Sequence, residues 1–227
     1  MRVTAIVAAA GRGTRIGGPR PKQFLDLGDG TIMLNRSVDA LLACDLIEEV
    51  VVAIAPEMFG AVRERSLPER VKHVVGGARR QDSVAVAMQH LGPDTTIVAV
   101  HDAVRPFVRV DEIESVLLEA HKSGAAVLAI PIVDTVKQIR KAVIDSTLTR
   151  EHLVLAQTPQ AFRIEVLREA FERARRDEYY GTDESSLVER LGLPVAVVRG
   201  SERNIKITRP DDLILARFFL QEEQARS

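Results

Sequence analysis

Short apolar runs alternate along this chain with segments whose apolar residues recur at helical spacing, and this alternation constrains the fold more than any other feature. The expected strands are residues 3–10, 49–55, 71–76, 96–102, 126–132 and 194–200. Their nearly uninterrupted apolar character is typical of strands that are covered on both faces. The expected helices are residues 33–45, 56–66, 79–91, 110–124, 164–177 and 211–224. The pattern predicts βαβ units, and therefore an α/β fold with a mostly parallel sheet covered by helices.

Length and charge limit the number of domains and the kinds of partner. The 227 residues, of which 46% are apolar, suit a single domain spanning residues 1–227. The formal net charge of −1 gives no global attraction to nucleic acid or to a membrane surface. No apolar run approaches the roughly 18 residues that cross a bilayer, and no signal peptide is visible. We therefore expect a cytoplasmic protein that binds neither nucleic acid nor membrane. The single cysteine, Cys44, is expected to pack in the core.

A basic, glycine-rich stretch follows the first expected strand. Residues 9–23 read AAGRGTRIGGPRPKQ, and such glycines let the backbone approach a ligand closely. Neither common nucleotide motif fits this string, because a dinucleotide fingerprint would need glycine at Ile16 and a Walker A loop would need lysine at Pro19. A small ligand with several negative charges is the interpretation that suits the cations of the stretch, which are Arg12, Arg15, Arg20 and Lys22.

Three segments that could bind such a ligand each lie at the end of an expected strand. They are residues 11–22, the pair Gly76 and Gly77, and the pair His101 and Asp102. Ligands of parallel α/β sheets bind at the carboxyl ends of the strands. We therefore expect the three segments to converge on one face of the domain.

The segment VHDAVRP (residues 100–106) suggests a cation site. Mg²⁺ usually takes one or two carboxylates together with substrate phosphates, so Asp102 could hold the metal. Arg105 could meet a phosphate or carboxylate in bidentate fashion. The alternative is an Asp102–Arg105 pair that braces a loop. We interpret His101 as a packing residue or a hydrogen-bonding brace and not as a catalytic group.

Residues 132–159 interrupt the alternation of strands and helices. Their β-rich, alternating polar and apolar residues have no helical face, which predicts an extended hairpin arm at about residues 132–155 with its turn near 141–146. A lone hairpin is marginal in water. We therefore expect the arm to pack against a second copy of itself in a homodimer.

Four further segments have local structural interpretations beside any functional one. Asp82 or Ser83 could cap a helix, and Thr182 could cap another. A turn is expected at Thr158–Pro159, between the arm and the next helix. Lys206 is expected in a short strand, where a lysine is usually a solvated surface residue, with Pro210 starting a helix.

Taken together and in order, the segments resemble one family. The strings that carry the resemblance are AAAGRGTRIGGPRPKQF, GGARRQDSV, HDAVRP, DTVK, LTREHLVLAQTPQAF, GTDESSLVE and NIKITRPDDL. They are similar to the 2-C-methyl-D-erythritol 4-phosphate cytidylyltransferases over nearly the whole chain. The resemblance implies a Rossmann-like nucleotidyltransferase sheet and a homodimer that exchanges its arm. It also implies transfer of a cytidylyl group from CTP to the sugar-alcohol phosphate, with Mg²⁺ and release of pyrophosphate, in non-mevalonate isoprenoid synthesis.

The same resemblance implies roles for individual residues. Arg15 and Lys22 would contact the phosphates and stabilise the transition state, and Asp102 would hold the metal. The residues that would frame CTP are Ala9, Ala10, Gly11, Gly13, Gly76, Gln81, Asp82 and Ser83. The residues that would hold the acceptor for in-line attack are Arg150, Lys206, Thr135, Arg105 and Thr158, and the partner subunit could supply those on the arm.

Other functions remain open at this stage. A cytidylyltransferase for another polyol phosphate, such as ribitol 5-phosphate, would use the same loop and the same metal. A non-catalytic nucleotide-binding module would bind nucleotide without turnover. An NAD-dependent oxidoreductase is disfavoured by Ile16 and by the prolines of the loop.

Overall fold

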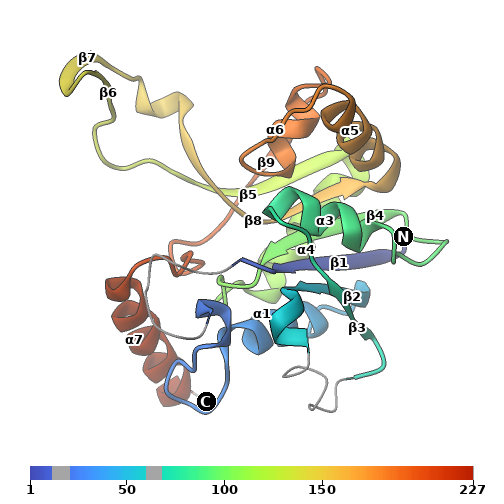
Figure 1. Ribbon diagram of the computed structural model, residues 1–227. Coiled ribbons are helices and arrows are strands. Elements are labelled where there is room, and N and C mark those ends of the chain that lie inside the picture. The colour runs from blue at the N-terminus through green and yellow to red at the C-terminus, as the bar shows by residue number, and fades with distance from the viewer. Residues whose placement is uncertain (12–20, 60–67, 227) are drawn as a thin grey trace.

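The computed structural model describes residues 1–11, 21–59 and 68–226. At its centre lies a seven-stranded sheet with the order β3-β2-β1-β4-β8-β5-β9 (Figure 1). The strands are β1 (Val3–Ala9), β2 (Ile47–Ile54), β3 (Val71–Val75), β4 (Ile97–Asp102), β5 (Ala125–Pro131), β8 (Val154–Arg163) and β9 (Ala196–Arg199). All six expected strands are present, and the prediction of an α/β fold is confirmed.

The sheet is mostly parallel, as predicted. β1 pairs in parallel with β2 and β4, β2 with β3, and β5 with β9. β8 is antiparallel to both of its neighbours, β4 and β5. The carboxyl ends of β1, β3 and β4 therefore lie at the same edge of the sheet, which brings together the segments that follow them.

Helices cover both faces of the sheet (Figure 1). Residues of α1 (Met33–Leu42) and α4 (Val110–Ser123) share one apolar cluster with the sheet. Residues of α3 (Arg80–Met88), α5 (Ile164–Arg176) and α6 (Glu184–Glu189) share the other. α7 (Pro210–Arg226) packs on a smaller cluster. Of the helix expected at 56–66, a 3₁₀ turn at Pro56–Met58 is seen, and residues 60–66 lie outside the described residues.

Strand β1 shows why its sequence is apolar throughout. Successive side chains of a strand point to opposite faces. Ala5 and Val7 contribute to the cluster with α1 and α4, whereas Ile6 contributes to the cluster with α3 and α5. Cys44 is buried in the first cluster, as predicted. None of the helices in the described part of the chain is long and apolar enough to span a membrane.

The expected turn at Thr158–Pro159 is wrong, because these residues lie within strand β8. Proline lacks an N–H group for the ladder, and within sheets it is confined to edges and irregularities. The β5–β8 register shifts between Val127 and Ala129, which pair with Gln160 and Ala156. Pro159 falls in this irregular stretch, so a central strand can contain it.

Two smaller expectations are also corrected. Residues 205–208, around Lys206, form no strand. This segment lies against the body through the Ile207 N–H, which donates to the Val104 carbonyl at 3.0 Å. Helix α6 is capped by Asp183 and not by Thr182, and the Asp183 carboxylate accepts from the Ser186 N–H at 3.0 Å. A carboxylate also complements the positive end of the helix dipole. Pro210 begins α7, as predicted.

The predicted arm is a hairpin that projects from the domain (Figure 1). Its strands β6 (Lys137–Arg140) and β7 (Val143–Thr147) pair with each other in a separate two-stranded sheet and are exposed along their whole length. The turn residues Lys141 and Ala142 have positive φ angles of 48° and 63°. Such angles suit the tight turn of a two-residue hairpin. From β7 the chain passes through a 3₁₀ turn at Arg150–His152 into β8, which starts at Val154.

A buried histidine joins β4 to β8 near the carboxyl end of β4. The His101 side chain is fully buried. Its Nε2 lies 3.1 Å from the Arg105 carbonyl, and its Nδ1 lies 3.1 Å from the Thr158 Oγ1. Thr158 Oγ1 accepts the Asp102 N–H at 3.0 Å. This arrangement suits a neutral ring with its proton on Nε2, because a carbonyl can only accept. His101 is thus the hydrogen-bonding brace that was expected.

Burial lowers the pKa of His101 to about 4, and this shift predicts a pH dependence of stability. In the unfolded chain His101 is protonated as the pH falls below about 6.5, whereas in the folded chain it stays neutral until about pH 4. The free energy of unfolding should therefore fall by about 3 kcal/mol from this residue as the pH drops through that window. Denaturant titrations at pH 6.5 and at about pH 4 should show a smaller decrease in the free energy of unfolding for His101→Gln than for the wild type. An NMR titration in which His101 protonates near pH 6.5 in the folded protein would contradict the prediction.

Candidate active site

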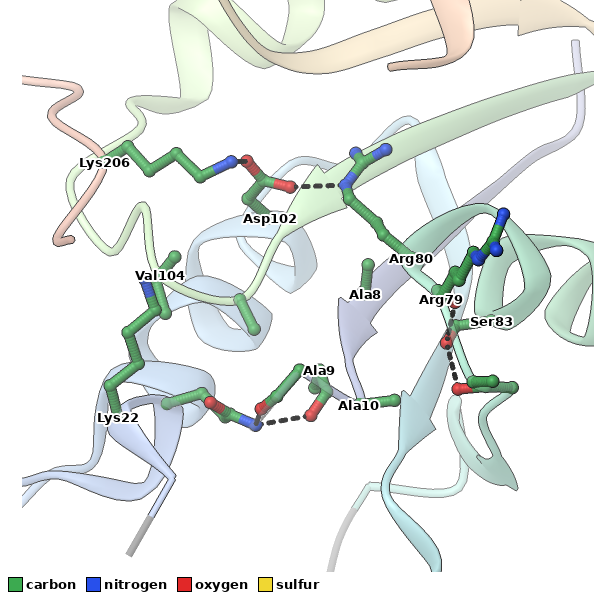
Figure 2. A pocket seen from close by; sticks show the side chains of 15 residues that line it. Ala8, Ala9, Ala10, Lys22, Arg79, Arg80, Ser83, Asp102, Val104 and Lys206 are labelled. Atoms are coloured by element: carbon green, nitrogen blue, oxygen red, sulfur yellow. Dashed lines mark hydrogen bonds and ion pairs between the residues drawn. The ribbon is translucent and has the colours of Figure 1, made fainter. Parts of the chain in front are cut away.

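A pocket lies where the segments after β1, β3 and β4 meet, as the sequence predicted (Figure 2). It opens at the carboxyl ends of these strands, where ligands of parallel α/β sheets bind. Its described lining residues are Ala8, Ala9, Ala10, Gly11, Lys22, Gln23, Gly77, Ala78, Arg79, Arg80, Ser83, Asp102, Ala103, Val104 and Lys206. Among these side chains, four are cationic and one is a carboxylate, so the lining favours an anionic ligand.

Small residues at and after the end of β1 line part of the pocket, and the side-chain amide of Gln23 holds their backbone in place. Gln23, on the 3₁₀ turn Lys22–Phe24, is buried. Its Nε2 donates to the Ala9 carbonyl at 2.6 Å and to the Gly11 carbonyl at 2.8 Å. Gly76 lies so close to this segment that a Cβ there would come within 2.5 Å of the Ala10 Cβ. Glycine is therefore needed at Gly76 for close contact between the two loops.

Asp102 is the centre of the charge network in the pocket. Its side chain is only 8% exposed. Oδ1 accepts from the Arg80 Nε at 2.9 Å, and Oδ2 lies 2.7 Å from the Lys206 Nζ. Figure 2 shows these two cations reaching the carboxylate from opposite sides. The Arg105 Nε lies farther away, at 3.8 Å from Oδ2.

These cations decide the charge of Asp102. Burial alone would raise its pKa, but Arg80 and Lys206 outweigh burial and hold the pKa of Asp102 far below its usual range. In turn, burial would lower the pKa of Arg80, but Glu184 and Asp102 raise it above the ordinary value. At neutral pH the pocket therefore contains an ionised carboxylate and a charged guanidinium.

Lys22 reaches the pocket from the segment after β1. Its Nζ donates to the Ile207 carbonyl at 2.8 Å. This bond joins the loop that carries Lys22 to the segment that carries Lys206 and brings both ammonium groups to the same pocket.

The structure brings together many of the predicted site residues and leaves others apart. The predicted residues that line the pocket are Ala9, Ala10, Gly11, Lys22, Ser83, Asp102 and Lys206. The predicted residues that lie next to it without lining it are Gly76, Gln81, Asp82, Arg105 and Thr158. Arg15 and Gly13 lie outside the described residues, so their roles stay predictions.

Two of the neighbouring residues hold the α3 loop by contacts within the protein. The Asp82 carboxylate accepts from the Arg79 N–H at 3.1 Å at the start of α3, whose N-cap is Arg79 and not Asp82 or Ser83. Gln81 donates to the Tyr179 carbonyl and accepts the Gly181 N–H. Contact of either side chain with CTP therefore stays a prediction.

Arg105 and Thr158 similarly have partners inside the domain. The Arg105 guanidinium donates to the Asn204 carbonyl at 2.7 Å and to the Ala156 carbonyl at 3.3 Å. These bonds hold the Lys206 segment and β8 next to Asp102. Thr158 bonds to Asp102 and His101 as described above. Contact of these two side chains with an acceptor stays a prediction.

The two predicted residues on the arm do not line the pocket of their own chain. Thr135 is exposed. Arg150 is about half exposed, and its Nη1 donates to the Val133 carbonyl at 2.6 Å. Both residues lie on the arm that projects from the domain (Figure 1), and their contact with an acceptor stays a prediction.

Sequence reasoning missed Arg79, Arg80 and Gln23 in the pocket, and Glu184 behind it. Arg79 and Arg80 belong to the segment GGARRQDSV, and positive charge at the start of a helix, next to a glycine pair, is a signal that could have identified them. The Arg79 guanidinium stacks on the Tyr180 ring, 3.7 Å from its centre. No sequence signal would have paired Glu184 with Arg80, because 104 positions separate them.

The arrangement can bind an anion and can contribute to a metal site. The described part of the chain contains no group of three or more acidic, histidine or cysteine side chains that could hold a metal ion. Mg²⁺, however, is usually bound by one or two carboxylates together with substrate phosphates. A single ionised carboxylate in a cationic pocket fits that pattern.

Comparison with known proteins identifies the family. Residues 3–222 match the family model described as IspD: 2-C-methyl-D-erythritol 4-phosphate cytidylyltransferase. A protein of that name from Solibacter usitatus is 48% identical, with 100% of this chain and 99% of that protein covered. Another of that name, from Syntrophus aciditrophicus, is 44% identical, with 99% and 98% covered.

The crystal structure of the Thermus thermophilus 2-C-methyl-D-erythritol 4-phosphate cytidylyltransferase has a similar fold. It superposes with a TM-score of 0.81 at 35% identity, covering 97% of this chain and 100% of that one. The family model and these relatives span nearly the whole chain. This chain therefore belongs to the 2-C-methyl-D-erythritol 4-phosphate cytidylyltransferase family.

Proposed function

We propose that the protein transfers a cytidylyl group from CTP to 2-C-methyl-D-erythritol 4-phosphate, releasing pyrophosphate and forming 4-diphosphocytidyl-2-C-methyl-D-erythritol. The observation that carries the proposal is the cationic pocket around Asp102 at the carboxyl ends of β1, β3 and β4. It lies in a chain that belongs to the family of this name over nearly its full length. The product is the cytidylylated intermediate of non-mevalonate isoprenoid synthesis.

The chemistry needs charge and positioning more than a base. The attacking phosphate is already anionic at neutral pH, so no proton has to be removed from the nucleophile. The barrier lies in bringing an anion to a triphosphate and in stabilising the charge on the α-phosphoryl oxygens. Lys22 would supply preorganised positive charge to those oxygens, together with Arg15. Lys206 would hold the acceptor phosphate beside the Asp102 carboxylate.

Asp102 is the residue that would hold Mg²⁺. The fit rests on its ionised state and on its position among cations in the pocket. When bound, the metal would neutralise charge on the triphosphate and orient it. Ala9, Ala10, Gly11 and Ser83 would frame the nucleotide. Because both Asp102 oxygens contact cations, Arg80 and Lys206 would have to share the carboxylate with the metal or turn toward the phosphates.

The arm would complete the site in a homodimer. Its apolar side chains are exposed, including Ile139 at 67%, Val143 at 68% and Ile144 at 61%. Exposed apolar groups on an otherwise unsupported hairpin favour a partner surface. In the proposed dimer the arm buries these groups and brings Thr135 and Arg150 to the partner's pocket.

We also propose a cytoplasmic location, where CTP is made and used.

Pyrophosphate release tests the reaction. Purified protein with Mg²⁺ and CTP should release pyrophosphate when 2-C-methyl-D-erythritol 4-phosphate is added and not when ribitol 5-phosphate is added. Release only with ribitol 5-phosphate would support cytidylyl transfer but contradict the proposed acceptor. CTP binding without release in either mixture would indicate a non-catalytic nucleotide-binding module.

Lys22→Ala should lower kcat by about 10²–10³, because it removes one preorganised charge from the transition state. Its melting temperature should stay near that of the wild type if Lys22 acts mainly on the ligand. Lys122→Ala, at an exposed lysine near the end of α4, is the control and should leave kcat unchanged. A near-normal kcat in Lys22→Ala would refute the assigned role.

Replacing Ile139 and Ile144 together by threonine should weaken the dimer. The two residues are cross-strand partners in the arm, and threonine keeps the strand propensity while removing apolar area. Sedimentation should show a dimer dissociation constant at least about tenfold higher, with activity falling as dimer is lost. Val197→Thr, at an exposed residue of β9, is the control. A monomeric wild type at micromolar concentration would contradict the dimer.

A further inference from the structure

Arg80 connects two buried carboxylates, of which only one lines the pocket. Its Nε donates to the Asp102 Oδ1 at 2.9 Å, and its Nη1 donates to both carboxylate oxygens of Glu184 at 2.8 Å. The Glu184 side chain is only 1% exposed and does not line the pocket. Figure 2 shows the Arg80 Nε turned toward Asp102, with its other two nitrogens on the far side. Glu184 therefore contacts Arg80 from behind the site.

The position of Glu184 is set by an anchored helix start. Glu184 is the first residue of α6, directly after the N-cap Asp183. Gln160 of β8 donates to the Asp183 Oδ2 at 2.7 Å and accepts the Ser185 N–H at 2.9 Å. The beginning of α6 is thus tied to the central sheet on both sides of Glu184. A side chain on such a support can hold a partner in one orientation.

Stability alone gives a weak reason for this buried pair. Taking a carboxylate out of water costs several kcal/mol, and apolar replacements of buried ion pairs are often neutral or stabilising. The bonds to Arg80 are the only hydrogen bonds of the Glu184 carboxylate among the described residues. The Glu184–Arg80 pair instead fixes the orientation of the guanidinium that donates to Asp102.

We propose that Glu184 is a positioning residue for nucleotide binding and cytidylyl transfer: it holds Arg80 so that Arg80 orients the Asp102 carboxylate. The inference rests on the proposed function, in which Asp102 holds the metal of the bound nucleotide. Without the Glu184 charge, the guanidinium is left with one buried carboxylate in place of two. Arg80 then pairs more strongly with Asp102, and its orientation is no longer fixed. As a result, the Asp102 carboxylate binds Mg²⁺ more weakly.

The test compares Glu184→Gln, Arg80→Met and the double variant in the full-length protein. Calorimetry measures CTP binding with and without Mg²⁺, and steady-state kinetics give kcat and KM for each substrate. Glu112→Gln is the matched control, because Glu112 is also a buried glutamate in the first turn of a helix and does not line the pocket. Melting temperatures report on folding, and Glu184→Asp tests whether a carboxylate at this place restores binding.

Glu184→Gln should weaken Mg²⁺-dependent CTP binding by about 10–100-fold, as supporting residues of metal sites typically do. The KM for CTP should rise more than the KM for the acceptor, and Glu112→Gln should bind CTP normally. The double variant should bind CTP no more weakly than Arg80→Met, because both changes break the same connection. Glu184→Asp should recover part of the lost binding.

Wild-type CTP binding and kinetics in Glu184→Gln would overturn the proposal, even if its melting temperature fell. The proposal would also be overturned if Glu184→Gln and Arg80→Met weakened CTP binding independently, so that their fold-effects multiplied in the double variant. If Glu184→Gln does not fold, Arg80→Lys carries the test, because one ammonium cannot reproduce the guanidinium contacts with both carboxylates. Unchanged CTP binding in that variant would overturn the proposal.

Failure of the proposed function would appear separately. A wild-type protein that binds CTP with Mg²⁺ but releases no pyrophosphate with either acceptor would contradict the reaction. The effect of Glu184→Gln on nucleotide binding would still be measured in that protein and would decide the positioning role. A wild-type protein that bound no CTP would overturn both proposals.

Discussion

The structure around the pocket depends on one buried carboxylate and the cations that keep it ionised. Asp102 ends strand β4, and its partners come from two distant segments, Arg80 at the start of α3 and Lys206 in the chain before α7. An ionised carboxylate buried without such partners would cost several kcal/mol. The ion pairs therefore tie the two segments to the edge of the sheet where the ligand is expected.

Much of the site is built by residues that do not face the ligand pocket. His101 connects β4 to β8 and to the loop of Arg105. Arg105 holds the segment that leads to Lys206 through the Asn204 carbonyl, and Glu184 holds Arg80 from behind. All three side chains are buried. These buried contacts hold the charged groups close to their places before phosphates arrive, which favours electrostatic stabilisation of a phosphoryl-transfer transition state.

The arm follows a different physical rule from the rest of the chain. The body buries a continuous apolar layer on each face of the sheet, whereas both strands of the arm are exposed along their whole length. A two-stranded hairpin has no core of its own. This lack of a core is the basis of the homodimer proposed above, and Thr135 and Arg150 on the arm lie outside the pocket of their own chain.

The sequence alone predicts the class of fold, the six apolar strands, the arm, and the meeting of Gly11, Gly77 and Asp102 at one edge of the sheet. These follow from local periodicity and from the rule that ligands bind where parallel strands end. It did not reveal that residues 154–163 form an antiparallel strand, because proline and polar residues there resemble a turn until β4 and β5 supply partners. Nor could it pair Arg80 with Glu184 or Lys22 with the Ile207 carbonyl. Such contacts join residues more than 100 positions apart, and only the packing of α6 and of the segment before α7 against the sheet decides which charges meet.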